Sequence, residues 1–188
     1  EGLLLDLPLD GQLEAAYAAG NPNAYQKKPE ASVRYVAGVN GQAVMPENGN
    51  LYYRADDNLS LAAGTILMWA KPVEWDPAEP SKRWTSFFDA HERTGKGGND
   101  KIAFWRYPEN MHGGRYNYHS ARGHNLDSML EDIEDWSQGE WKFFAFTWAE
   151  DGISELYVDG ERVARRRRPA DKRPRVITEF CLSSSGTA

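Results

Sequence analysis

The sequence predicts an all-β protein in which two antiparallel sheets pack face to face as a sandwich. Residues 141–164 contain three short apolar stretches separated by two sets of turn residues, which is the pattern of an antiparallel meander. Many further short apolar stretches alternate with turn residues, while no long amphipathic helix is evident. A length of 188 residues suits one domain with a substantial core, so we expect residues 1–188 to form a single domain.

The most regular part of the chain is the predicted meander. Residues 141–148, Trp-Lys-Phe-Phe-Ala-Phe-Thr-Trp, are apolar at both sets of alternating positions, which predicts a strand buried on both faces. Turn residues at 150–152 separate it from a short strand over 156–158. Asp-Gly at 159–160 favours a type I′ hairpin, because both central residues of that turn need a positive φ, and a third strand is expected over 161–164.

Short strands are also expected along the rest of the chain, separated by loops rich in glycine, proline and acidic residues. Pro8 restricts the first strand to a sheet edge, since proline has no N–H to donate to a central ladder. Residues 12–25 are expected to form an irregular loop, with a short helix over 13–19 as the alternative. Apolar residues at helical spacing predict a short helix over 127–135. The further strands are expected at 3–9, 33–36, 42–44, 51–53, 59–61, 64–71, 84–89, 102–107, 116–120 and 176–182.

Three motifs along the chain together resemble one known family. Residues 141–160 carry Trp-x-x-x-Ala-x-Thr-Trp and then Leu-Tyr-Val-Asp-Gly, residues 64–72 read Gly-Thr-Ile-Leu-Met-Trp-Ala-Lys-Pro, and residues 7–11 read Leu-Pro-Leu-Asp-Gly. Their order and spacing resemble those of laminin-G-like (concanavalin A-like) lectin and glucanase domains. The resemblance covers most of the chain and implies a two-sheet antiparallel jelly-roll sandwich. That fold carries lectins, adhesion modules, glycanases and spacers, so it does not decide the function.

The chain departs from that family at its end. Laminin-G-like domains of this type close with a strand of the form Asp-x-x-Ile-Asp-Glu-Leu-x-Ile-Tyr, which pairs near the first strand. Residues 183–188 read Ser-Ser-Ser-Gly-Thr-Ala instead. We therefore expect the final strand to be missing, so that either the given sequence is a fragment or another segment covers that edge. An uncovered edge would expose unpaired backbone groups and invite pairing with a partner.

Composition and charge speak against several classes of protein. The formal net charge is -6, which argues against nucleic-acid binding. No apolar run approaches the roughly 20 residues of a membrane span. Cys181 is the only cysteine, so no intramolecular disulfide can form, and we expect it to be a buried apolar residue. The lack of disulfides fits a bacterial exported protein or a cytosolic one better than a secreted animal domain. Of these we expect a bacterial protein in an extracytoplasmic location: secreted, periplasmic or at the cell surface.

A catalytic role is not expected. The resemblance implies that glycanases with this fold place two carboxylates on one strand face, in a pattern close to Glu-x-Asp-x-x-Glu. The nearest stretch, Glu-Asp-Ile-Glu-Asp at 131–135, has acids that cannot all share one strand face. The sequence also lacks a nucleophile elbow, a zinc-protease motif and a phosphate loop. We therefore expect a non-catalytic binding module.

Carbohydrate is the expected ligand, and residues 102–122 are the expected site. Lectin sites combine a flat aromatic ring, which stacks on the apolar face of a sugar, with polar side chains that bond its hydroxyl groups. This stretch has that composition, although its aromatic residues would also suit the core of the sandwich. The candidate ligand-binding residues are Trp105, Tyr107, Tyr116, Tyr118, His119 and Arg122.

An arginine run supports an alternative function. Residues 162–175 include eight basic residues and one acid, and the run itself is Arg165, Arg166, Arg167 and Arg168. Prolines at 169 and 174 predict a loop, which is either simply solvated or docks an anionic partner. The alternative to a lectin is therefore a structural or protein-interaction domain. It would be an accessory part or subunit of a larger extracytoplasmic assembly, docked through the open sheet edge and this arginine-rich loop.

The sequence leaves the residues of a metal site unknown. His112, His119 and His124 lie close together in the sequence but match no known zinc spacing. One structural calcium ion is the expected cofactor, since the resemblance implies a calcium site at the sandwich rim, and calcium takes about six to eight oxygen ligands from several loops. Oxygen donors are available in Asp10, Asp56, Asp57, Asn99, Asp100 and Asp151.

Overall fold

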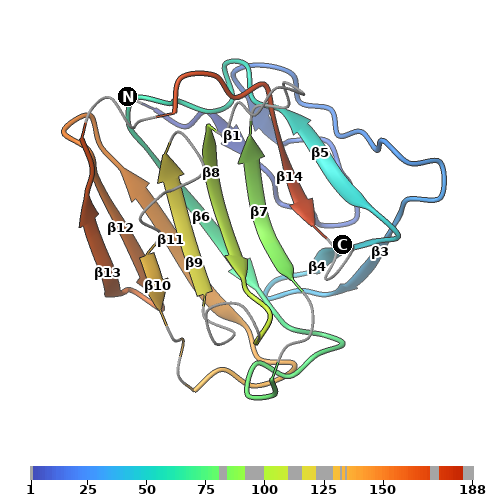
Figure 1. Cartoon of the computed structure of the whole chain (residues 1–188). Helices are drawn as coiled ribbons and strands as arrows, with labels where there is room; N and C mark the ends of the chain where they lie inside the picture. Colours follow the sequence, from blue (N-terminus) through green and yellow to red (C-terminus); the bar gives the residue numbers. More distant parts are fainter. Residues whose placement is uncertain are drawn as a thin grey trace.

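The computed structural model of the chain describes residues 2–80, 84–91, 100–109, 116–121, 129–131, 133, 135–169 and 174–183. For residues 91, 116–121, 129–131 and 183 it describes the backbone alone. All regular secondary structure in these ranges is β-strand, and the strands form two antiparallel sheets that pack face to face (Figure 1). The described residues include no helix of a length and apolarity that would cross a membrane. The predicted all-β sandwich is confirmed.

The larger sheet has six strands and the smaller has four. From edge to edge, the larger sheet contains β10 (Met129–Glu131), β9 (Tyr116–Ala121), β8 (Lys101–Arg106), β7 (Thr85–His91), β14 (Glu179–Ser183) and β5 (Asn50–Arg54). The smaller sheet contains β13 (Glu161–Arg167), β12 (Ile153–Val158), β11 (Lys142–Trp148) and β6 (Gly64–Ala70). Two short additional sheets pair β1 (Leu5–Asp6) with β2 (Tyr17–Ala18), and β3 (Ser32–Ala37) with β4 (Gln42–Glu47).

The meander predicted from sequence forms three of the four strands of the smaller sheet. β11 pairs with β12, and β12 pairs with β13, both antiparallel. Asp159 and Gly160 have φ values of 50° and 89°, as the type I′ hairpin requires. At the first turn Gly152 has a φ of 84°. A Cβ atom there would lie 2.0 Å from the Arg168 carbonyl oxygen, so only glycine fits without a shift of the backbone.

Aromatic side chains from both sheets form the core between them. Phe104 of β8 packs against Phe144 and Phe146 of β11, with ring centroids 5.0 and 4.8 Å apart. Leu156 of β12 joins this cluster, and all four side chains are buried. Burial of each such side chain contributes about 1.5–3 kcal/mol relative to exposure. A second cluster is centred on Leu51, Tyr53, Ile102 and Phe180.

The expectation that β11 is buried on both faces is wrong. Alternate residues from Lys142 to Trp148 are buried, whereas Phe143, Ala145 and Thr147 between them are half-buried. The reason is that the larger sheet covers only one face of the smaller sheet. On the other face, no further layer of described residues packs over β11.

Pairing between distant segments also overrides three local expectations. Residues 129–131 form β10, which pairs with β9, instead of the predicted helix over 127–135. The first strand is limited to Leu5–Asp6 and pairs with β2, which forms within the expected irregular loop. Residues 59–61 are not a strand. Helical spacing and short apolar runs predict local structure only weakly where a neighbouring strand can form hydrogen bonds with the backbone.

The arginine run is mostly strand, which corrects the expectation of a loop. β13 continues to Arg167, and Arg165 lies opposite Glu155 of β12. Prolines end the strand but do not prevent it, because β12 pairs with β13 up to Arg167, with one register shift between Leu156 and Tyr157.

Candidate functional site

β8 presents different side chains on its two faces. Ile102 and Phe104 belong to the core between the sheets, so Ala103 and Trp105 lie on the outer face of the larger sheet. Ala103, Trp105 and Tyr107 form an apolar cluster of their own, separate from that core. This is the stretch for which the sequence predicted a sugar-binding site.

Trp84, which comes just before β7, covers this outer cluster. Its ring centroid lies 4.6 Å from that of Tyr107 and 5.5 Å from that of Trp105. Trp84 is 37% exposed, whereas Trp105 is 5% and Tyr107 is 9% exposed. The Nζ atom of Lys101 lies 5.3 Å from the centroid of the Trp105 ring, within the range of a cation–π contact. The outer face therefore presents one exposed aromatic ring on a base of two buried rings.

The backbone register divides the predicted residues of β9 between two faces. His119 pairs with Ala103, so it belongs to the outer face. Tyr118 pairs with Phe104 and belongs to the core-facing side, together with Tyr116 two residues earlier. The structure thus places Trp105, Tyr107 and His119 on one side of the sheet and the two tyrosines of β9 on the other.

The predicted site also extends beyond the described part of the chain. Arg122 lies outside it, as do the side chains of β9. A direct contact between the predicted residues and a ligand therefore stays a prediction.

Sequence reasoning did not single out Trp84, which it assigned only to the start of a strand. The available signal was a tryptophan at a strand end beside a charged, proline-rich loop, a place where a large apolar side chain is often left partly exposed.

A buried carboxylate organises another part of the outer face. Glu179 of β14 is 7% exposed and accepts a hydrogen bond from the Tyr25 hydroxyl at 2.5 Å, while Lys27 donates to its other oxygen. The Tyr25 ring stacks on Tyr52 of β5 with centroids 5.5 Å apart. Burial, together with the hydrogen bond to Glu179, raises the pKa of the Tyr25 phenol well above its ordinary value. Glu179 thus fixes the segment around residue 25 onto the sheet.

The four arginines of the predicted docking run do not share one surface. The Arg165 and Arg167 side chains are 54% and 68% exposed on the outer face of the smaller sheet. Arg166 alternates to the other face and is half-buried, and Arg168 is buried. The run therefore offers two exposed guanidinium groups rather than four.

Acidic neighbours partly neutralise these exposed arginines. Arg162 and Arg165 lie 2.9 and 3.4 Å from one carboxylate oxygen of Glu155. Arg167 pairs with Asp151 at 3.0 Å. Hydrogen bonds from Tyr157, and then from Arg162, lower the pKa of the Glu155 carboxyl. Water screens exposed pairs of this kind, so they constrain the arginines only weakly.

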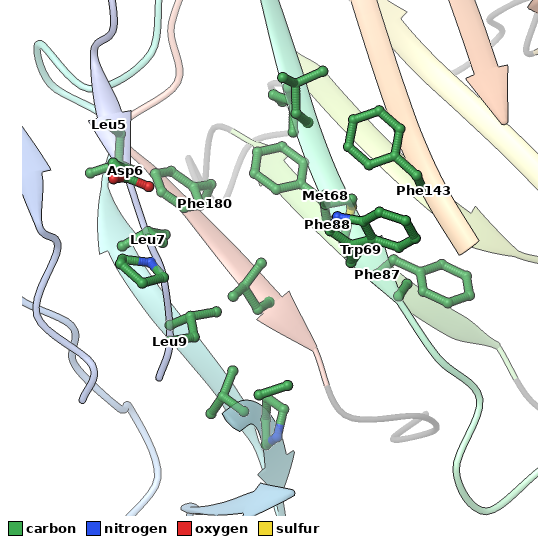
Figure 2. Close-up of a pocket in the computed structure, with 18 of the residues that line it drawn as sticks. Leu5, Asp6, Leu7, Leu9, Met68, Trp69, Phe87, Phe88, Phe143 and Phe180 are labelled. Atoms are coloured by element: carbon green, nitrogen blue, oxygen red, sulfur yellow. The ribbon is translucent and has the colours of Figure 1, made fainter. Parts of the chain in front are cut away.

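A groove of 1670 Å³ opens between β6 and the N-terminal segment. Leu5, Leu7 and Leu9 project from that segment on one side, Met68 of β6 lies on the other, and Phe180 of β14 lies between them (Figure 2). All these lining side chains are apolar. The groove lies over the inner face of the larger sheet, beyond the edge of the smaller one.

Three of the acidic side chains expected to bind calcium make contacts within the protein. The described residues include no group of three or more His, Cys, Asp or Glu side chains that could hold a metal ion. Asp10 and Asp100 accept backbone N–H groups at 2.8 and 2.9 Å, and Asp151 pairs with Arg167. Asn99 lies outside the described residues, and calcium binding stays a prediction.

A family model decides which family this sandwich represents. The model of the concanavalin A-like lectin/glucanases superfamily matches residues 47–179, from the end of β4 to the start of β14. The chain belongs to this superfamily. The match confirms the resemblance seen in the three sequence motifs. No curated protein matches this superfamily member in sequence.

Several solved structures share the fold at low sequence identity. Domain 4 of AbnA, a GH43 extracellular arabinanase from Geobacillus stearothermophilus in complex with arabinotriose, has a TM-score of 0.63 and 14% identity, over 96% of this chain and 82% of that chain. The globular domain of T. cruzi calreticulin has a TM-score of 0.55 and 10% identity, over 85% and 77% of the two chains. The carbohydrate esterase vb_24B_21 from the Shiga toxin-encoding bacteriophage phi24B has a TM-score of 0.54 and 17% identity, over 87% and 89%. At these identities the likeness extends to the jelly-roll fold alone.

Proposed function

We propose that this superfamily member is a non-catalytic module that binds carbohydrate on the outer face of its larger sheet. The observation that carries the proposal is the exposed Trp84 ring, which rests on the buried rings of Trp105 and Tyr107. An exposed indole held in place by its neighbours suits stacking against the apolar face of a sugar ring.

The proposed mechanism combines this stacking with hydrogen bonds to sugar hydroxyl groups. The two buried rings fix the Trp84 side chain before binding, so less conformational entropy is lost when the sugar stacks on it. Lys101 lies beside Trp105, and His119 belongs to the same face by register. We include both as polar partners, together with the predicted Arg122. In this mechanism the side chains of Trp105 and Tyr107 support the Trp84 ring.

Two further observations support the proposal. The first concerns binding without catalysis, and the second concerns the location of the protein. A glycanase needs two carboxyl groups placed about 5–10 Å apart across the scissile bond. On the outer face, the Glu179 carboxylate is held by Tyr25 and Lys27, which favours a structural role over a catalytic one for this acid. The similar arabinanase domain is part of an extracellular enzyme and was solved with a bound sugar. We propose an extracytoplasmic, bacterial setting on that basis.

Replacement of the exposed ring tests the proposal. Trp84→Ala should weaken binding to any sugar bound by the wild-type protein at least about tenfold, by titration calorimetry, because the stacking surface is lost. Trp69→Ala is the matched control, because Trp69 is half exposed on the other sheet. Undiminished binding by Trp84→Ala, or equal losses in both variants, would contradict the proposed site.

A second candidate function is docking to an anionic protein within a larger assembly. Arg165 and Arg167 favour it, since both are more than half exposed on β13, an edge strand of the smaller sheet.

Polyglutamate serves as a probe of an anionic polypeptide. The double variant Arg165→Glu/Arg167→Glu should bind it at least about tenfold more weakly at low salt. Lys28→Glu/Arg175→Glu has the same change in charge at exposed positions elsewhere and should lose less. Equal losses would show that only net charge matters.

A further inference from the structure

We propose that Asn40 is a site of spontaneous deamidation, and that the acid formed there loosens the contact between the N-terminal segment and the hairpin of β3 and β4. The residues involved, 5–11 and 38–42, lie outside the sites of both proposed functions. The proposal is therefore independent of sugar binding and of the arginines.

The sequence contains an asparagine followed by glycine at two places, Asn40–Gly41 and Asn48–Gly49. In deamidation the backbone nitrogen of the following residue attacks the carboxamide carbon of the asparagine. Glycine hinders this attack least, because it has no side chain and can adopt more backbone conformations than any other residue. The two asparagines are therefore the candidates, and their surroundings decide which of them reacts.

The turn between β3 and β4 leaves Asn40 open to reaction. Asn40 and Gly41 are both exposed, and Gly41 has a φ of 61°. The turn is closed by a hydrogen bond that the Gly38 N–H donates to the Gly41 carbonyl at 3.0 Å. Among the described residues, none accepts a hydrogen bond from the Gly41 N–H, so the attacking nitrogen is not held in the turn.

The other asparagine is held more firmly. Asn48 has a φ of 59° and is exposed, but Gly49 is buried. A Cβ atom on Gly49 would lie 2.9 Å from the Cβ atom of Ala31, which shows how closely the backbone is packed there. Ring closure requires both residues of the pair to rotate, so this packing should slow the reaction at Asn48.

The reaction needs no partner other than water. The Gly41 nitrogen forms a bond to Cγ of Asn40, the bond from Cγ to Nδ2 breaks, and ammonia leaves with the proton of the Gly41 nitrogen. Water then opens the cyclic imide. Cleavage of the new bond to Cγ gives aspartate, and cleavage of the original peptide bond gives isoaspartate. Nothing is oxidised or reduced, and either product carries a carboxylate in place of a neutral amide.

An existing carboxylate lies directly beside this turn. A Cβ atom on Gly41 would lie 2.6 Å from both carboxylate oxygens of Asp10. One of these oxygens accepts a hydrogen bond from the Gln42 N–H at 2.8 Å. Since consecutive Cα atoms are about 3.8 Å apart, a carboxylate at residue 40 would lie within about 10 Å of Asp10, which is one Debye length in dilute salt. The two negative charges would repel each other and weaken the contact of Asp10 with the hairpin.

This contact holds a strained part of the N-terminal segment. Leu9 has a φ of 56°, which is unfavourable for a leucine and persists only where the surroundings enforce it. Leu7 and Leu9 pack against the core cluster around Leu51, while the pairing of β1 with β2 is limited to two residues of each strand. Weakening of the Asp10 contact should therefore loosen residues 7–11 without unfolding the sandwich.

Ageing of the folded wild-type protein tests the chemistry. After incubation at mildly alkaline pH, peptide mapping by mass spectrometry should show aspartate and isoaspartate at residue 40. Asn40 should react at least about tenfold faster than Asn48, because residues held in a packed segment reach reactive conformations less often. In concentrated urea the two rates should become similar, which would show that the fold causes the difference.

Variants test the structural consequence separately. Asn40→Asp places the product charge in the turn. Hydrogen exchange should show amides of residues 7–11 exchanging at least about threefold faster at low salt, with a smaller effect at high salt. Asn48→Asp makes the same change beside the other glycine and should leave these amides unaffected. Asn40→Ser removes the carboxamide without adding a charge, so it should neither react nor loosen the segment.

Two outcomes would overturn the inference. The first is deamidation of Asn48 in the folded protein at the same rate as Asn40 or faster. The second is exchange of residues 7–11 that is the same in Asn40→Asp as in Asn40→Ser. Neither outcome would affect the tests of sugar binding or of polyglutamate binding, which use other residues.

Discussion

Trp84 meets Tyr107 edge-on, with ring centroids 4.6 Å apart and the ring planes at 73°. The contact joins an exposed side chain to a buried one on the outer face of the larger sheet. The Tyr107 ring, with Trp105 beside it, thereby sets the position of Trp84. This arrangement assigns different roles to neighbouring aromatic residues, and those roles can be separated by mutation.

Stability should distinguish the supporting ring from the exposed one. Trp105→Ala should lower the free energy of unfolding by about 3–5 kcal/mol, because it removes a buried indole and leaves a cavity under Trp84. Trp84→Ala should cost about 1 kcal/mol, since its ring is partly in water already. Chemical denaturation of both variants measures the difference. A loss below about 1 kcal/mol for Trp105→Ala would mean that its ring is not a structural support.

The two turns of the meander should respond differently to the same substitution. Gly152→Ala should destabilise the protein by about 3 kcal/mol or more, because a Cβ atom would lie 2.0 Å from the Arg168 carbonyl oxygen at a positive φ. Gly160→Ala also has a positive φ, but no atom lies within 4 Å of the added Cβ, so the cost should be about 1 kcal/mol. Thermal unfolding of both variants checks the order, and equal losses would contradict this account of the first turn.

The hydrogen bond from Tyr25 to Glu179 should make stability fall at alkaline pH. The pKa of Tyr25 is raised in the folded protein, chiefly by burial and then by the hydrogen bond. The unfolded tyrosine loses its proton near pH 10 while the folded one keeps it. The stabilisation is therefore complete below about pH 10 and is lost as pH rises above it.

The Tyr25→Phe variant tests this linkage. It removes the hydroxyl group, so its stability should fall less steeply above pH 10 than that of the wild-type protein. At pH 7 the variant should be less stable by about 1–2 kcal/mol, because a hydrogen bond to a buried carboxylate is lost. Burial also raises the pKa of Tyr53, so some alkaline slope should remain. Urea unfolding at pH 8, 10 and 11 measures both effects, and identical slopes would argue against the assigned role of Tyr25.

Local patterns predicted the parts of the fold that depend on local chemistry. The turn at Asp159 and Gly160 and the strands on either side follow from residues next to each other in sequence. The place of β14 does not, because it lies between β7 and β5, and its partners are far away in the chain. Sequence alone therefore did not show which strands end each of the two described sheets.

The candidate site was predicted in part for a similar reason. Alternation placed Trp105 and Tyr107 on one face of the predicted strand, and only the structure shows that this face points away from the core between the sheets. It did not reveal that Trp84 covers them, because this contact joins residues of different segments. The arginine run was expected to be a loop because charge and proline dominate its composition, whereas pairing with β12 decides its backbone.

A glycan array, run with calcium and again with a chelator, tests the central claim most directly. We expect the folded wild-type protein to bind one defined class of sugars, and Trp84→Ala to lose that binding while Trp69→Ala keeps it. Loss of binding on chelation would add the expected calcium ion. A blank array under both conditions, with the protein shown to be folded, would contradict the carbohydrate-binding account and favour a protein partner.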